Sequence, residues 1–187
     1  MNSQIIKDSR LAEEYLRVEH PSGLTMLLYP MKGFSTAYAM FSTKYGSIDT
    51  CFQRGEDADF VKVPEGIAHY LEHKMFESEE GDAFEKYAQT GASANAFTSF
   101  DKTCYLFACT DRFQESLEIL LDCVTHPYFT KETVEKEQGI IGQEIRMYED
   151  DPGWRVMFNL LQSLYQNNSV KVDIAGSIES IAQIDAE

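Results

Sequence analysis

The feature that most constrains the fold of this chain is the run His69-Tyr70-Leu71-Glu72-His73. In an α-helix each residue advances by about 100°, so side chains at positions i and i+4 share a face and lie about 6 Å apart along the axis. His69 and His73 can therefore converge on one ion, with the carboxylate of Glu72 beside them. We expect this run to lie on a rigid helix that faces a second element carrying further ligands.

The spacing of the run indicates a zinc site that carries its own base. Zinc takes nitrogen or oxygen ligands at about 2.0–2.2 Å, and a catalytic zinc keeps three protein ligands and an open position for water. Glu72 would lie next to that water and is the natural proton acceptor. The order H-x-x-E-H is the reverse of the more familiar H-E-x-x-H of zinc hydrolases. Two histidines leave one protein ligand to be found.

An acidic helix expected further along the chain offers that ligand. Glu137 and Glu144 are seven residues apart, almost two turns, so they project from nearly the same face. Glu135 and Glu149 share that register less well. One of the first pair can ligate the ion and the other can support it. An acidic helix alone is more often a solvated face, and the histidine run upstream is what favours a site here.

Hydrophobic periodicity predicts strands early in the chain and helices later, an α+β arrangement. The expected strands are Tyr15–Glu19, Leu24–Tyr29, Ala37–Tyr45, Ser93–Ser99 and Thr103–Thr110. The expected helices are one that begins at Pro64 and contains the histidine run, then Asp82–Thr90, Arg112–Thr125, Thr133–Tyr148 with Thr130 as N-cap, and Trp154–Tyr165. Residues 49–62 are polar and lack a period, which predicts a loop. Residues 170–174 fit a strand or a loop, and residues 177–184 fit the start of a further helix.

Length and charge narrow the class of protein. A chain of 187 residues fits one compact unit. Its net charge of −15 disfavours nucleic acid and anionic membrane surfaces as partners. No stretch approaches the roughly 20 apolar residues of a membrane span, and the first residues lack the layout of a secretory signal, so we expect a cytoplasmic protein without membrane insertion. The four cysteines have no C-x-x-C spacing and are expected to be reduced thiols.

Several further segments, together with the histidine run, resemble the insulinase or pitrilysin family of metallopeptidases, including bacterial insulinase-like proteins and mitochondrial processing peptidase. The matching segments occur in the family's order and cover nearly the whole chain, which makes them far more specific than the five-residue run alone. They are the early strands, Glu65 to Phe76, Gly91 to Thr98, Asp101 with Thr103 and Tyr105, and Glu137 to Glu144.

The resemblance implies a fold, an activity and a role for each candidate residue. The fold would be an antiparallel-rich sheet flanked by helices on one side, and the activity that of a zinc metalloendopeptidase. His69, His73 and Glu144 would hold Zn²⁺, Glu72 would be the general base, and Glu137 would be a supporting acid near the catalytic centre.

The resemblance also implies how a peptide substrate would bind. The segment Asn95, Ala96, Phe97 and Thr98 would be a docking strand, to whose edge an extended peptide adds through main-chain hydrogen bonds. Active members of the family usually contain two related halves. Residues 1–187 would be a single N-terminal catalytic half, truncated at its C-terminus and weakly active or inactive alone. A second homologous half or a paralogous subunit would be its partner.

Two alternatives to a peptidase remain open from the sequence. S-ribosylhomocysteine lyase also carries H-x-x-E-H in a small α/β protein, but with a cysteine as third ligand; Cys104, Cys109 and Cys123 are formal candidates. The other alternative is a non-catalytic subunit that binds peptides and keeps the fold. The intact Glu72 argues against that alternative, because a scaffold does not need a base beside the metal.

Overall fold

A computed structural model describes residues 2–55 and 59–186. Contacts divide the chain into two compact units, one that ends at Ser35 and one that begins at Thr36. Among the described residues, no helix is both long and apolar enough to cross a membrane.

The first unit is an antiparallel meander of three strands, in the order β1-β2-β3. Its strands are β1 (Asn2–Asp8), β2 (Glu13–Glu19) and β3 (Thr25–Leu28). The second and third strands confirm the predicted pair, but β1 was not predicted. Most of its residues are exposed, so the segment lacks the alternation of apolar and polar residues that marks a half-buried strand. Pairing with β2 defines it instead.

The second unit contains every residue assigned to the candidate site. Its strands are β4 (Ala37–Thr43), β5 (Cys51–Gln53), β6 (Phe60–Lys62), β7 (Glu77–Ser78), β8 (Gly81–Asp82), β9 (Ser93–Thr98) and β10 (Thr103–Cys109). Its helices are α1 (Ile67–Lys74), α2 (Ala83–Thr90), α3 (Phe113–Thr125), α4 (Lys131–Glu149), α5 (Pro152–Leu164) and α6 (Ile178–Ile181), with a 3₁₀ turn η1 at Ser169–Lys171.

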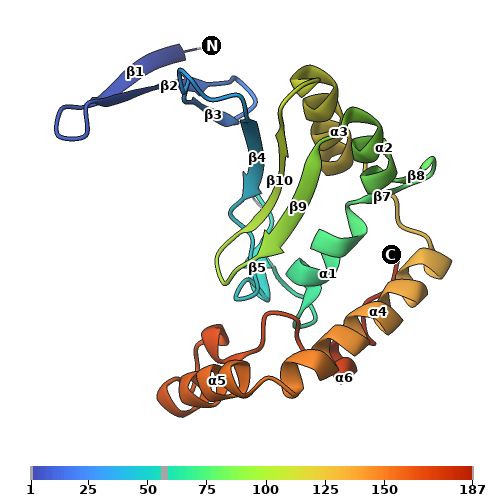
Figure 1. Ribbon diagram of the computed structural model, residues 1–187. Helices are drawn as coiled ribbons and strands as arrows, with labels where there is room; N and C mark the ends of the chain where they lie inside the picture. The colour runs from blue at the N-terminus through green and yellow to red at the C-terminus, as the bar shows by residue number, and fades with distance from the viewer. Residues whose placement is uncertain (1, 56–58, 187) are drawn as a thin grey trace. The chain divides into compact units, whose positions relative to one another are not determined.

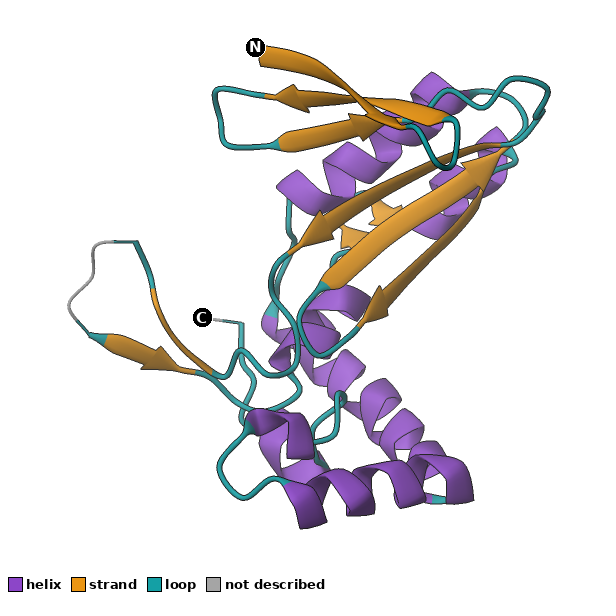
Figure 2. Cartoon of the chain, turned by 90° about the vertical axis from the view of Figure 1, so that its left-hand side faces the viewer, coloured by secondary structure: helices purple, strands orange, loops and turns teal. Residues whose placement is uncertain are grey.

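The main sheet of this unit is antiparallel, with β10 between β4 and β9. Alternate residues of β10 point into a core that α2 and α3 close from the other side; its fully or nearly fully buried members are Phe76, Ala83, Tyr87, Tyr105, Phe107, Cys109 and Leu120. Helices α1, α2 and α3 lie on the same side of the sheet (Figures 1 and 2). This confirms the expected α+β class, with an antiparallel sheet flanked by helices on one side.

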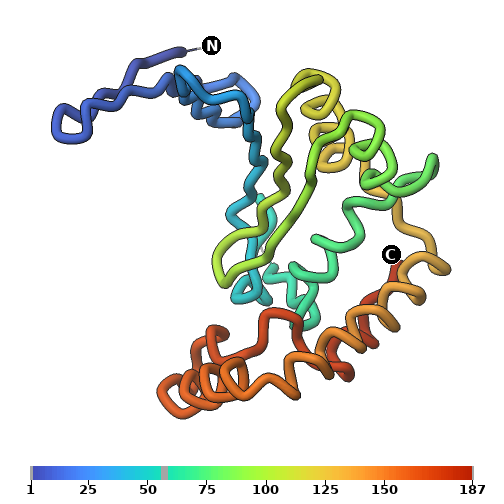
Figure 3. Tube along the Cα trace, viewed as in Figure 1, coloured from blue at the N-terminus to red at the C-terminus, as the bar shows by residue number. Residues whose placement is uncertain are grey.

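A second core joins α1 to α4 and α6. Its buried residues are Tyr70, Val134, Ile141, Ile145, Ala175, Ile181 and Ile184. The segment after α5 runs back beside α4 (Figure 3), and the Gln138 amide donates to the Ile184 carbonyl at 2.9 Å. This packing fixes α4 against α1, and these two helices carry the candidate ligands.

Among the local predictions, the N-cap of α4 is confirmed and the loop at residues 49–62 is wrong. Thr130 caps α4 through a capping box, and the predicted helix α2 is capped by Asp82 and ends at Gly91, which is in the left-handed region. The loop predicted for residues 49–62 contains the hairpin of β5 and β6, whose three-residue strands are too short to show a period; residues 56–58 lie outside the described residues. Residues 169–171 form a 3₁₀ turn and no strand follows in 172–174, so of the two possibilities for residues 170–174 the structure supports the loop.

Candidate metal centre

Helix α1 starts at a point where two backbone segments nearly touch. Gly66 precedes it with φ of +88°, a left-handed conformation that favours glycine. A Cβ atom at Gly66 would stand 2.4 Å from the Ala175 carbonyl oxygen, so no side chain fits there. The Ser180 hydroxyl donates to the Glu65 carbonyl at 2.8 Å and closes the same junction. The first turn of α1 is therefore held against the segment before α6.

Two turns of α1 and the middle of α4 bring three candidate ligands together. Nε2 of His69 lies 3.7 Å from one carboxylate oxygen of Glu144, and Nε2 of His73 lies 3.4 Å from the other. One ligand atom of each residue lies within 4.8 Å of the others. The structure thus places the predicted ligand set in one cluster, drawn from two helices.

The charges in this cluster fit a cation. Burial lowers the pKa of His69 to about 4, so this imidazole is neutral near pH 7. Its Nδ1 is buried without a hydrogen-bond partner among the described residues, and its Nε2 is too far from Glu144 for a hydrogen bond. A metal ion between Nε2 and the carboxylate would use the lone pair of Nε2 and balance the charge of Glu144, while Nδ1 would carry the ring proton. The residues present therefore fit zinc.

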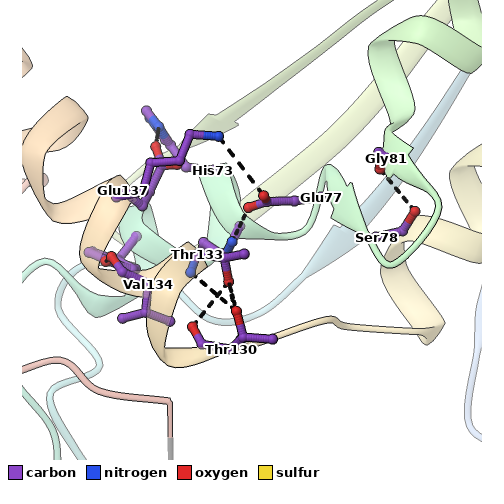
Figure 4. Close-up of polar contacts among 11 residues, drawn as sticks. His73, Glu77, Ser78, Gly81, Thr130, Thr133, Val134 and Glu137 are labelled. Atoms are coloured by element: carbon purple, nitrogen blue, oxygen red, sulfur yellow. Dashed lines mark hydrogen bonds and ion pairs between the residues drawn. The ribbon is translucent and has the colours of Figure 1, made fainter.

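Glu137 contacts the ring nitrogen of His73 that points away from Glu144. His73 Nδ1 lies 2.9 Å from a carboxylate oxygen of Glu137 (Figure 4), which leaves Nε2 directed at Glu144. Burial alone would lower the pKa of His73, but its bonds to Glu137 and Glu144 outweigh burial and raise the pKa to about 10. Glu137 is itself buried. A carboxylate behind a ligating histidine fixes the ring orientation and raises its basicity, the arrangement expected for a supporting acid.

Tyr148 also acts on Glu144, and its role was not predicted from the sequence. The contact with His73 is the main cause that lowers the pKa of Glu144, and Tyr148 lowers it further. Tyr148 stacks on Trp154 with ring centroids 4.5 Å apart, and Trp154 Nε1 donates to Asp173 at 2.5 Å. The spacing of four residues from Glu144 to Tyr148, one helical turn, was the signal available in the sequence.

Glu72 faces the same space as the ligands. Burial raises its pKa, and the Thr98 hydroxyl donates to Oε2 at 3.0 Å. A pocket of about 200 Å³ opens here. Its walls are the ligands and Glu72, residues Ala96, Phe97 and Thr98 of β9, and Tyr148, Trp154, Ile174 and Ala175. The pocket thus brings the three candidate ligands and the Glu72 carboxylate to one space.

Asn95 does not line this pocket. Its side chain is exposed on the face of β9 opposite to Ala94, Ala96 and Thr98, and its amide oxygen accepts from the Ala96 backbone at 2.9 Å. In the described part of the chain, β9 pairs with β10 alone, so its other edge is open. The predicted role of Asn95–Thr98 in substrate binding remains a prediction, and the open edge is compatible with it.

The family model that describes insulinase, peptidase family M16, matches residues 54–177. This chain belongs to that family. The matched range includes α1, β9 and the part of α4 that carries Glu137 and Glu144.

Relatives in the insulinase family agree with this assignment. The uncharacterized zinc protease YmfH of Bacillus subtilis is 50% identical over 179 residues, which cover 96% of this chain and 42% of YmfH. The crystal structure of a putative M16-like peptidase from Alicyclobacillus acidocaldarius is 43% identical, with a TM-score of 0.86 over 91% of this chain and 40% of that one. Pitrilysin, at 19% identity and a TM-score of 0.76, covers 96% of this chain and 19% of its own length, and shares the fold.

This member of the insulinase family spans less than half the length of the relatives above. The zinc protease names belong to those longer proteins. The activity, substrates and partners of the protein that contains this chain are therefore matters of proposal.

Proposed function

We propose that the protein that contains this chain is a zinc-dependent endopeptidase that hydrolyses peptides or small unfolded polypeptides. The observation that carries the proposal is the convergence of His69, His73 and Glu144 from two helices, with the Glu72 carboxylate on the same pocket. Three ligands and one adjacent base are the minimum set for metal-assisted hydrolysis.

His69, His73 and Glu144 would hold the zinc ion. When bound, zinc lowers the pKa of a water molecule to about 7 and polarises a peptide carbonyl. Glu72 takes the proton of the attacking water and returns it to the departing amine. Its raised pKa suits both tasks, because a base whose pKa lies closer to the working pH also donates more readily. Glu137 keeps the His73 ring in place through Nδ1.

The peptide would bind as an extra strand on the open edge of β9. This position is supported by Ala96, Phe97 and Thr98, which line the same pocket as Glu72. Main-chain hydrogen bonds along an edge bind an extended peptide with little regard to its sequence. This favours unfolded polypeptides over folded ones. Residues outside this chain, in a second half or a paralogous subunit, would complete the binding site.

Neither alternative from the sequence fits the pocket as well. In a lyase of the kind considered, a cysteine would be the third ligand, but the side chain at that position is Glu144 and the residues that line the pocket include no cysteine. A peptide-binding scaffold would need the open edge of β9 but not a half-buried carboxylate beside the candidate ligands. Glu72 is such a carboxylate.

The proposal is tested by turnover of a peptide library with the natural protein that contains this chain, before and after chelation. Chelator should abolish turnover and added zinc should restore it. Glu72→Gln should lower turnover by several orders of magnitude while zinc content stays unchanged, because the base is lost and the ligands are kept. Glu135→Gln, an exposed glutamate on α4, is the matched control and should keep full turnover. Unchanged turnover in Glu72→Gln would refute the proposed mechanism.

A further inference from the structure

Among the described residues, Thr98 makes the one side-chain hydrogen bond to the Glu72 carboxylate. Its hydroxyl donates to Oε2 at 3.0 Å. The bond joins β9 to α1, which are packed together although the two residues are 26 positions apart in sequence. A carboxylate held at one oxygen has lost most of its freedom to rotate, and its other oxygen is left for the proton that it accepts.

The backbone around Thr98 is fixed independently of that bond. Thr98 is the last residue of β9 and pairs directly with Thr103 of β10. The next residue, Ser99, donates its backbone N–H to the Lys102 carbonyl at 2.8 Å and accepts from the backbone N–H of Ser47 at 3.0 Å. Thr98 is also β-branched, so its χ1 angle is restricted. The hydroxyl is thus aimed at Glu72 by a rigid strand end.

We propose that Thr98 is a positioning residue for the Glu72 base, rather than a residue that contacts substrate. The inference rests on the proposed function, since it assigns Glu72 as the base. Because Thr98 belongs to the strand whose open edge would receive the peptide, the same strand sets the position of the peptide and the direction of the base. The position of the Glu72 carboxylate relative to the scissile bond then depends on the hydroxyl of Thr98.

Thr98→Val tests this, because valine keeps the β-branched shape and removes only the hydroxyl. In the natural protein that contains this chain, kcat should fall about 10- to 100-fold, the range expected when a reacting group is misplaced by about 1 Å. KM and zinc content should be unchanged. Thr98→Ser retains a hydroxyl and should recover most of kcat.

Thr103→Val is the matched control. Thr103 lies directly opposite Thr98, and its hydroxyl donates to the Tyr45 carbonyl at 2.9 Å rather than to the base. This variant should lower the melting temperature but leave kcat of the folded protein within about twofold of wild type, since it also removes one hydrogen bond. An equal fall in kcat in both variants would reduce Thr98 to a packing role and overturn the inference.

Three other outcomes would also overturn it. They are an unchanged kcat in Thr98→Val, a rise in KM alone, which would make Thr98 a substrate contact, and a loss of zinc. Crystal structures of the wild type and Thr98→Val give a readout that does not need activity. If the natural protein hydrolyses no peptide, the proposed function fails, and the structures still decide the inference: the Glu72 carboxylate should turn away from the pocket in the variant, and an unmoved carboxylate would contradict us.

Discussion

At the scale of single residues, the site depends on how His73 is shared between two carboxylates. Glu137 is hydrogen-bonded to Nδ1 of His73, and Glu144 lies opposite Nε2 of the same ring. These two contacts fix the orientation of the His73 ring. His69 lacks such support, because its Nδ1 has no partner among the described residues. The two imidazoles are therefore unequal: His73 is oriented by α4, and His69 by burial in α1.

We expect Glu144→Gln to weaken zinc binding by more than about a hundredfold, beyond the loss typical of a supporting residue, because a neutral amide replaces an anionic ligand. Isothermal titration of metal-free protein measures this affinity. Glu135→Gln on the same helix is exposed and should bind zinc like the wild type. Cys123→Ser should also bind normally. Loss of zinc with the cysteine and not with Glu144 would instead support a lyase-like ligand set.

At the scale of elements, helices α1 and α4 act as two rigid carriers of the ligands. Their relative position is set by the core of Tyr70, Ile141 and Ile145 and by the junction of Gly66 with Ala175. The junction is the more sensitive of the two, since it is a contact between backbone atoms that cannot rotate away. A substitution at this junction should lower both the free energy of unfolding and the affinity for the metal ion.

Gly66→Ala should destabilise the protein by roughly 2–6 kcal/mol, combining the strain of a left-handed alanine with a backbone clash. Gly91→Ala is the matched control. Gly91 also has a positive φ, of +74°, but a Cβ atom there would meet nothing within 4 Å, so only about 1–2 kcal/mol should be lost. Urea denaturation of both variants measures the difference. An equal loss of unfolding free energy in the two variants would show that the contact of Gly66 with Ala175 adds nothing to the cost of a left-handed alanine.

The sequence predicted the helices and strands in which side chains of one kind recur at the period of the element. It missed the strands that only their hydrogen bonds to a neighbouring strand define. Helix α4 was predictable because Glu137 and Glu144 fall on one face and Thr130 marks its start. Strand β1 and the hairpin of β5 and β6 were not, because their residues are largely exposed or their strands span three residues. Each of these strands is defined by its pairing with the neighbouring strand and not by a pattern within its own residues.

The candidate ligands were predictable, but their surroundings were not. The histidine run and the seven-residue spacing on α4 are local patterns that indicated His69, His73 and the pair Glu137 and Glu144, and the resemblance to the insulinase family then singled out Glu144 as the ligand. The bond from Thr98 to Glu72 and the stack of Tyr148 on Trp154 depend on how β9 and α5 pack, which no local spacing reveals. Asn95, assigned to the docking strand by resemblance, lies outside the pocket, although Phe97 on the same face of β9 lines it.

At the scale of the whole molecule, the three candidate ligands lie within this chain, but the chain covers less than half of its longer relatives. All three ligands and Glu72 lie in the unit that begins at Thr36, and the chain covers 42% of YmfH. We expect purified residues 1–187 to bind zinc at one equivalent and to cleave peptides far more slowly than the natural protein that contains them. Comparing kcat/KM of the two at equal zinc occupancy measures this. Equal efficiency would show that this chain suffices.

The central claim is that α1 and α4 together hold one zinc ion through His69, His73 and Glu144. The most direct measurement is a crystal structure of the zinc-loaded protein, with anomalous data collected on both sides of the zinc absorption edge. The claim predicts a single strong anomalous peak about 2.0–2.2 Å from Nε2 of both histidines and from a Glu144 carboxylate oxygen. A peak at any other set of side chains, or a Glu144 carboxylate turned to solvent beside a zinc held by the histidines alone, would contradict it.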